Sequence, residues 1–141
     1  MIRYRTDLDG IRPTQLSGFF EGWPNRPSPE THLRILRGSD HVALAIDVEA
    51  EGVVGFATAI TDGVLAAYVP LLEVLPRHRG RGIGSELVRT LLNSLDGYYM
   101  IDLVTDPALE EFYVPLGFGP AHAMAIRRRD MQSGRPDDTA D

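Results

Sequence analysis

The sequence predicts one α+β domain, built on a mixed, mostly antiparallel central sheet of six to seven strands flanked by helices. Strand-like apolar runs follow one another between residues 41 and 75 with only short turns between them, which is typical of antiparallel pairing. A helix follows, since apolar residues recur every four positions at Ile83, Leu87, Leu91 and Leu95. The next run, YYMIDLVT, is again strand-like, so strand, helix and strand predict one right-handed parallel crossover.

The first part of the chain predicts a strand, a loop and a helix. Ile2–Arg5 alternates apolar and polar residues, as a short strand does, and one helical turn is expected near Thr14–Leu16. The stretch FFEGWPNRPSPE contains three prolines and predicts a loop packed by its own aromatic rings. Ser28 followed by proline marks a helix start, and that helix should end at Gly38.

Three strands are expected in the middle of the chain. His41–Asp47 and Val53–Thr61 form a predicted hairpin, and Thr61-Asp62-Gly63 is a second turn signal. The long run Val64–Leu75 contains Pro70, which cannot donate a ladder hydrogen bond. Pro70 therefore predicts a bulge or a locally free edge in this strand.

The last third of the chain predicts a strand, a short helix, another strand and a tail. Tyr98–Thr105 is the strand that completes the crossover, and Asp106-Pro107 begins a short helix that ends near Gly117. His122–Arg127 is expected to be the last strand. We assign residues 1–129 to a single domain and predict that the polar segment 130–141 is disordered.

Composition limits the classes of function. The chain has 141 residues and no cysteine, which excludes disulfides, cysteine-ligated zinc and a cysteine nucleophile. The net charge is -6 and all basic residues are arginine, which argues against nucleic acid as a partner and would favour a cationic substrate such as an amine. The first residues lack the apolar core of a signal peptide, and no run is long enough to span a membrane. We expect a cytoplasmic protein with no membrane partner.

The loop RGRGIGS, residues 79–85, lies between a predicted strand and a helix start. Unpaired backbone N–H groups and the positive end of the helix dipole suit a phosphate or pyrophosphate there. The loop is not a P-loop, because no Gly-Lys-Ser/Thr follows. It is not the dinucleotide fingerprint either, because Ser85 stands where the third glycine would fall.

Two motifs in this order carry a family resemblance. Arg79-Gly80-Arg81-Gly82-Ile83-Gly84, preceded by Val74-Leu75-Pro76, resembles the acetyl-CoA motif Arg/Gln-x-x-Gly-x-Gly/Ala of the GNAT superfamily of N-acetyltransferases. Downstream, FYVPLGF (residues 112–118) resembles the FYxxLGF signature of that superfamily. The segments YVPLLEVLP and YYMIDLVTD are similar to a bacterial branch of the superfamily whose acceptors are generally unassigned.

The resemblance implies a site for acetyl-CoA, the acyl-donor substrate, and no metal. Backbone N–H groups of the glycine loop would wrap the CoA pyrophosphate, and the glycines would let it approach closely. The strand before the loop would splay from the next strand, so that free backbone groups near Val74 and Leu75 pair with the pantetheine. The implied cofactor-binding residues are Val74, Leu75, Arg79, Gly80, Arg81, Gly82, Ile83, Gly84, Ser85 and Tyr113. Ser85 would bind a phosphate or cap the helix.

Tyr113 and Glu73 are the candidate catalytic residues. Tyr113 matches the family position whose phenol protonates the CoA sulfur, a transfer that is uphill by about 2 kcal/mol at unperturbed pKa values. The acceptor amine must lose a proton at a cost of about 5 kcal/mol at neutral pH, which calls for a base or a water chain. Glu73 is the only carboxylate in the strand beside the loop, whereas Tyr68 holding a water and Asp102 in the apolar strand MIDLV are the alternatives.

The implied function is direct transfer of an acetyl group to a primary amine of a small molecule or peptide, within a ternary complex. The alternatives are a degenerate CoA-binding sensor and an acyltransferase that uses a different acyl-CoA. A homodimer is compatible with the implied fold. Asp106 stands where the family often has asparagine, and we interpret it as a helix cap. Trp23 and Phe19–Phe20 would line the acceptor site or pack the helix.

Overall fold

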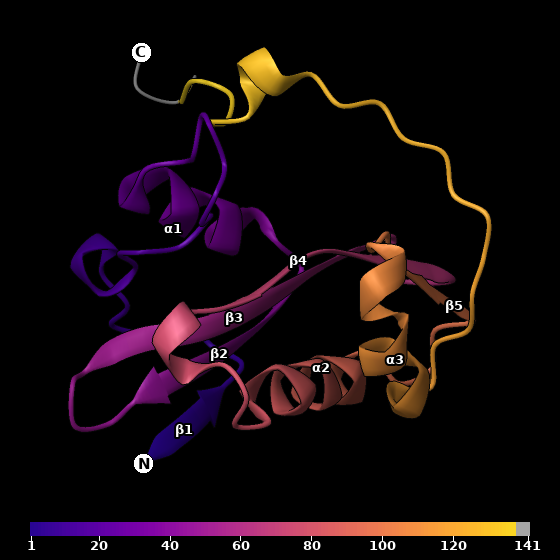
Figure 1. Ribbon diagram of the computed structural model, residues 1–141, viewed down its shortest axis with the longest axis horizontal. Coiled ribbons are helices and arrows are strands. Elements are labelled where there is room, and N and C mark those ends of the chain that lie inside the picture. The colour runs from indigo at the N-terminus through magenta and orange to yellow at the C-terminus, as the bar shows by residue number, and fades with distance from the viewer. Residues whose placement is uncertain (138–141) are drawn as a thin grey trace.

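The computed structural model describes residues 1–137, which form a five-stranded sheet with strand order β1-β2-β3-β4-β5 (Figure 1). The strands are β1 (Ile2–Arg5), β2 (His41–Asp47), β3 (Gly52–Thr61), β4 (Ala66–Val74) and β5 (Met100–Asp102). β1 to β4 pair antiparallel in sequence order, and β5 pairs parallel with β4. The predicted mixed α+β sheet with one parallel pair is confirmed, whereas the predicted six to seven strands are not, because five are found in the described part of the chain.

Two helices cover opposite faces of the sheet (Figure 1). α1 (Pro29–Gly38) lies over one face and α2 (Ile83–Ser94) over the other, while α3 (Glu110–Tyr113) lies beside α2. On the α2 face, Ile83, Leu87, Leu91 and Leu95 are all buried, as their spacing predicts. On the α1 face, Phe56 of β3 packs with side chains of α1 and of the preceding loop. Single turns of 3-10 helix occur at Pro13–Gln15, Pro76–His78, Pro107–Leu109, Val114–Leu116 and Arg129–Met131.

The helix cap, the turn and the bulge that the sequence predicts are found at the predicted residues. The Ser28 side chain accepts a hydrogen bond from the Thr31 backbone N–H (3.1 Å) and caps α1, which ends at Gly38. A carboxylate oxygen of Asp62 accepts the N–H groups of residues 64–66 and closes the β3–β4 turn. The predicted bulge at Pro70 is confirmed. Thr58 pairs with Leu71 and Ile60 with Tyr68, so β4 holds one extra residue beside Pro70.

The end of the chain departs from the predictions. β5 covers only three residues of the predicted strand Tyr98–Thr105. The predicted strand His122–Arg127 is wrong, because this segment leaves the sheet and runs outside β5 as an extended strap (Figure 1). Residues 119–128, which we call the C-terminal strap, are all exposed. In the described part of the chain their backbone makes no hydrogen bond to any strand.

The tail beyond the strap lies against the α1 region. The backbone N–H of Asn25 donates to the Gln132 side chain (3.0 Å), and Arg34 donates to the backbone oxygen of Arg135 (2.8 Å). These contacts involve residues 130–137, the part of the predicted disordered tail that the structure describes, and residues 138–141 of that prediction lie outside the described residues. None of the helices in residues 1–137 is long and apolar enough to cross a membrane.

Candidate active site

The glycine loop presents a row of free backbone donors. Gly80 and Gly82 have φ angles of 77° and 79°, in the left-handed region that suits glycine, and Gly82 is the N-cap of α2. Within the described residues, the backbone N–H groups from Gly80 to Ser85 have no protein acceptor. A Cβ at Gly80 or Gly82 would meet no atom within 4 Å, so both face open space. An anion can approach these donors at the positive end of α2.

The other residues of the glycine loop have structural roles. A Cβ on Gly84 would lie 3.3 Å from the Phe112 ring, so this glycine lets α3 pack against the start of α2 and joins the two sequence motifs. Ile83 is a buried core residue, and only its backbone faces the loop. Ser85 has no hydrogen bond as a cap within residues 1–137, because Gly82 occupies the cap position.

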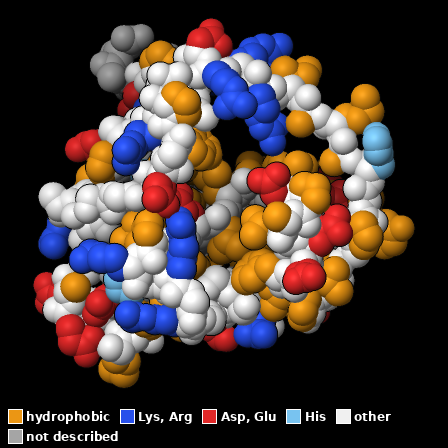
Figure 2. Space-filling view, in the orientation of Figure 1, with side chains coloured by type: hydrophobic (Ala, Val, Ile, Leu, Met, Phe, Trp, Pro, Cys, Tyr) orange, Lys and Arg blue, Asp and Glu red, His pale blue; other side chains and the backbone are white. Residues whose placement is uncertain are grey.

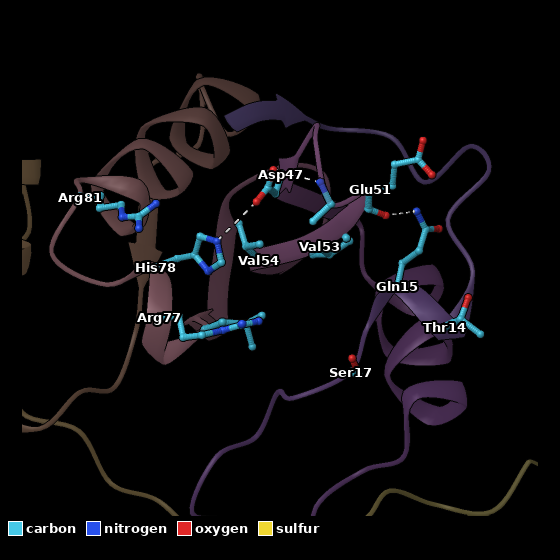
Figure 3. A pocket seen from close by; sticks show the side chains of 13 residues that line it. Thr14, Gln15, Ser17, Asp47, Glu51, Val53, Val54, Arg77, His78 and Arg81 are labelled. Atoms are coloured by element: carbon cyan, nitrogen blue, oxygen red, sulfur yellow. Dashed lines mark hydrogen bonds and ion pairs between the residues drawn. The ribbon is translucent and has the colours of Figure 1, made fainter. Parts of the chain in front are cut away.

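The two loop arginines point to different places. Arg79 Nε donates to the backbone oxygen of Val74 (2.9 Å), and its guanidinium pairs with Glu21 (3.0 Å). Arg81 is exposed and lines a separate hollow of about 510 Å³ between the loop and the β2–β3 hairpin (Figure 3). In that hollow His78 Nε2 lies 3.7 Å from Asp47. Arg79 is therefore the arginine held at the end of β4.

β4 and β5 separate in front of the loop. Only Ala66–Tyr68 pairs with β5, and within the described residues the rest of β4 has no strand on that side. The backbone N–H of Leu75 donates to Val54 of β3 (2.8 Å). Because ladder bonds alternate along a strand, the backbone of Val74 points into the gap between β4 and β5. Of the two predicted pantetheine partners, Val74 thus faces the gap, and its oxygen already accepts Arg79.

Tyr113 lies at the other side of the site, on α3. Its half-buried ring packs edge-on against Phe112 and Phe118, with ring centroids 4.8 and 5.7 Å away. Within residues 1–137 its hydroxyl has no hydrogen-bond partner. Burial raises the pKa of Tyr113 above its usual value, so the phenol is protonated at neutral pH. It is thus available as a proton donor.

A cavity of about 410 Å³ lies beside Tyr113 and under the C-terminal strap. Tyr68, Asp102 and His122 also line it, and Figure 2 shows the hollow between the strap and the body of the molecule. Asp102 is exposed, so its charge needs no buried partner. The structure therefore brings Tyr68, Asp102 and Tyr113 to one cavity.

Glu73 lies on the opposite side of β4 from α2. It pairs across the sheet with Phe56, whose side chain faces α1. One carboxylate oxygen accepts the backbone N–H of Phe20 (2.7 Å), and the other accepts that of Glu21 (3.3 Å). Phe20 has a φ of 61°, which is uncommon for a non-glycine residue, and Glu73 holds it there. Glu73 thus fixes the loop before α1.

The aromatic loop is mainly a packing element. Phe19 and Phe20 are buried and contact His32 and Phe56 edge-on, as the packing interpretation predicts. His32 is also buried, and burial lowers its pKa to about 4. Trp23 is half-buried and lies against Phe20.

Asp106 stands at the predicted helix-cap position, but its side chain does not act as a cap. Asp106 is the N-cap of the turn Pro107–Leu109, but its side chain makes no capping hydrogen bond. Its backbone oxygen accepts the N–H of Leu109 (2.9 Å). Within residues 1–137, no group of three or more acidic or histidine side chains is placed to hold a metal ion.

Sequence reasoning missed Glu21 and His122 as residues of the site. Glu21 pairs with Arg79 across 58 positions of the chain, and no local pattern signals a contact of that range. The alternation of residues 122–127 predicts a strand, whereas in the structure His122 lines the cavity from the strap. The prolines and glycines that precede His122 were the available signal that the chain turns away from the sheet.

Comparisons with known proteins agree with this geometry. The model of the acetyltransferase (GNAT) family matches residues 8–118. The crystal structure of a proposed acetyltransferase from Deinococcus radiodurans R1 is 48% identical, with a TM-score of 0.93 over 96% of this chain and 94% of that one. A GNAT-family acetyltransferase from Streptococcus pneumoniae is 27% identical, with a TM-score of 0.72 over 91% and 99% of the two chains.

A more distant structure is similar in fold alone. It is an aminoglycoside N-acetyltransferase in complex with CoA, 19% identical, with a TM-score of 0.60 over 91% of this chain and 94% of that one. No protein of curated function matches the sequence.

Proposed function

Because the chain belongs to the acetyltransferase (GNAT) family, we propose that it transfers an acetyl group from acetyl-CoA to a primary amine of a small molecule or peptide. The observation that carries this proposal is the gap between β4 and β5, which opens in front of the free N–H groups at the start of α2. A pyrophosphate on those donors would leave the pantetheine arm to run along the gap toward Tyr113. The hydroxyl of Tyr113 has no other partner in the described chain to compete for its proton.

The reaction is a direct attack within a ternary complex. The neutral amine nitrogen forms a bond to the thioester carbon, and the carbon–sulfur bond then breaks. Tyr113 gives its proton to the departing thiolate and is restored from solvent. Because burial raises the pKa of this phenol, transfer to sulfur is uphill, and a hydrogen bond to the developing thiolate has to offset that cost.

We propose Glu73 as the base that takes the proton of the amine, through a water. It lies on the same face of β4 as Tyr68, next to the loop that begins at Phe20. Both carboxylate oxygens already accept backbone N–H groups, so Glu73 also positions this loop. The two roles are compatible because each carboxylate oxygen has a second lone pair.

The decisive experiment compares wild type with Tyr113→Phe in an assay of CoA release. The phenyl ring keeps its packing against Phe112 and Phe118, so only the hydroxyl is lost. We expect kcat to fall by about 100-fold or more, while the Kd for CoA is unchanged. Tyr4→Phe is the matched control, because Tyr4 also has a pKa raised by burial but lies on β1 at the other edge of the sheet.

The assay also separates the alternatives. Its acceptor panel would contain a polyamine, an aminoglycoside, an amino sugar and peptides with a free N-terminus, each with acetyl-CoA and with longer acyl-CoA donors. Tight CoA binding with no release for any pair would replace this proposal with a CoA sensor. Faster turnover with a longer acyl group would replace acetyl as the transferred group. Full activity of Tyr113→Phe would remove Tyr113 as the acid.

A further inference from the structure

A hollow of about 510 Å³ lies on the opposite side of β4 from the gap in front of the glycine loop (Figure 3). It is lined by Asp47 at the end of β2, Val53 and Val54 at the start of β3, and Arg77 and His78 in the turn after β4. Because the strand order is β2-β3-β4-β5, the hollow borders the β3 side of β4, whereas the gap is on the β5 side. A pantetheine arm in the gap would therefore leave the hollow free.

Two arginines of this hollow have no partner of their own. Arg77 and Arg81 are exposed, and neither makes a hydrogen bond or ion pair with another residue in the range 1–137. Arg79, which lies between them in the sequence, is instead held by the Val74 backbone oxygen and the Glu21 carboxylate. Guanidinium groups match the geometry of carboxylates and phosphates. The two free arginines can therefore bind an anion.

The acidic side chains of the hollow leave this positive charge available. Asp47 accepts the backbone N–H groups of Ala50 (3.3 Å) and Glu49 (3.0 Å), and these hydrogen bonds lower the pKa of Asp47. Its other carboxylate oxygen lies 3.7 Å from His78 Nε2. The side chain of Glu51 points away from the hollow (Figure 3). The hollow thus presents two cationic groups and one carboxylate that already has partners.

His78 and the back of the hollow define the other features of a ligand. The His78 side chain is only 13% exposed, and its Nδ1 atom is buried without a hydrogen-bond partner among the described residues. Buried polar atoms of this kind are normally paired, so a polar group fits beside this ring. Val53 and Val54 add an apolar wall (Figure 3). The volume suits an organic molecule and exceeds what a bare anion fills.

We propose that this hollow binds a small organic dianion, either a phosphate monoester or a dicarboxylate, at a site separate from the acyl-donor site. Arg77 and Arg81 hold the charged groups of the ligand, and its carbon chain lies on Val53 and Val54. A dianion is preferred to a monoanion, because each of the two guanidinium groups then attracts a charge of its own.

The position of the hollow gives the ligand an effect on CoA, a consequence that rests on the proposed function. Arg77 and Arg81 lie in the segment that leads into the free N–H groups from Gly80 to Ser85. A dianion beside this segment opposes the binding of a pyrophosphate there. We expect the dianion to raise the Kd for CoA by about fivefold at low salt, and CoA to raise the Kd for the dianion by the same factor. A Kd for CoA that stays constant up to saturating dianion would refute this coupling.

The first test is calorimetry of the full chain with propyl phosphate and with glutarate, two dianions that each carry a short carbon chain. We expect a Kd of about 1 mM or tighter for one of them, and a Kd about tenfold higher for inorganic phosphate, which has no carbon chain. Propanol is the uncharged control and should not bind. The tighter probe distinguishes a phosphate ester from a dicarboxylate. Equally weak binding of every anion would indicate only a charged surface and would overturn the proposal.

Variants and NMR then locate the bound dianion. Arg77→Gln and Arg81→Gln should each raise the Kd of the tighter probe by about tenfold or more. Both side chains are exposed, so thermal unfolding should stay at the wild-type temperature. Arg89→Gln is the matched control, an exposed arginine on α2 outside the hollow, and should leave the Kd unchanged. The methyl signals of Val53 and Val54 should shift during the titration. An unchanged Kd in both hollow variants, or valine signals that do not move, would contradict the proposal.

The second test separates the hollow from a contact with CoA itself. CoA carries a phosphate on its adenosine ribose, and dephospho-CoA lacks it. We expect Arg81→Gln to change the Kd for both molecules by the same factor. A loss of affinity for CoA alone would assign Arg81 to that ribose phosphate and overturn the proposal. Dianion binding is measured without acetyl-CoA or an amine, so a failure of the proposed acetyl transfer would not affect its outcome.

Discussion

The two halves of the site are built in different ways. The half at the start of α2 consists of backbone N–H groups, oriented by two glycines with positive φ and by a helix whose apolar face is fully buried. The half around Tyr113 consists of side chains on a four-residue helix and on an exposed strap. The half at the start of α2 is held in place by the backbone conformation of the loop and by the packing of α2 on the core. The second depends on contacts that lie at the surface.

This difference matches what each half has to bind in the proposed reaction. The pyrophosphate of CoA is the same in every turnover, and a rigid row of backbone donors suits it. The acceptor differs between enzymes of one fold, and exposed segments tolerate changes of sequence that a core does not. Glu73 and Arg79 both bind the loop at Phe20–Glu21, Glu73 from β4 and Arg79 from just beyond its end. Each prediction below disturbs one element of this arrangement and measures cofactor binding, turnover or stability.

Gly82→Val should break the backbone half. A β-branched residue is strained at a φ of 79°, so α2 would start differently and its free N–H groups would no longer converge. We expect the Kd for CoA, measured by calorimetry, to rise on the order of 100-fold, which is about 3 kcal/mol. Gly10→Val is the control, because Gly10 has a φ of 73° and no neighbour within 4 Å but lies in another turn. Equal losses of CoA affinity in both variants would indicate general unfolding.

His32 should make the packing beneath the loop at Phe20 sensitive to acid. The folded pKa is about 4, below the usual 6.5, because burial disfavours the charged ring. The neutral His32 ring contributes up to about 3 kcal/mol to the free energy of unfolding. This contribution is complete above pH 6.5 and is lost as the pH falls through 4. Urea unfolding at pH 7.5 and pH 4 measures it. His32→Leu should flatten this dependence, while His122→Leu, an exposed site, should keep it.

The sequence predicts the backbone half of the site far better than the side-chain half. Ser28, Gly38, Asp62 and Pro70 act locally, so their effects can be read from neighbouring residues, and the repeat from Ile83 to Leu95 reports one buried face. The contacts of Glu73 with Phe20 and of Arg79 with Glu21 join residues that are more than 50 positions apart. No local pattern encodes such pairs.

The same reasoning explains the error at the strap. His122–Arg127 has the alternation of a strand, and alternation predicts a strand without saying which edge it joins. Among the described residues this segment pairs with no strand. A strand forms only where a second strand is available to pair with it. The segment has the residue pattern of a strand, and the prediction is wrong because no strand lies next to it.

Glu73→Gln separates the positioning role of Glu73 from its proposed role as base. The amide oxygen can still accept the Phe20 N–H, but the amide cannot take a proton. We expect kcat/KM for the amine to fall at least tenfold, about 1.4 kcal/mol, and the acid limb of its pH profile to change. A purely positioning residue would raise the acceptor KM and leave the pH profile intact. Glu86→Gln, an exposed carboxylate on α2, is the control and should alter neither quantity.

Glu21→Gln should have the smallest effect, and the sign of that effect tests how the halves communicate. The side chains of Glu21 and Arg79 are 53% and 51% exposed, so their pair contributes less than about 1 kcal/mol to stability. Without the carboxylate of Glu21, the positive charge of Arg79 attracts the pyrophosphate more strongly. The Kd for CoA should therefore fall about twofold at low salt and converge with the wild-type value at high salt. Asp96→Asn at the far end of α2 should show no such change. A weaker affinity for CoA in Glu21→Gln would mean that the pair aims Arg79 at the gap, and the acidic loop would then belong to the cofactor half.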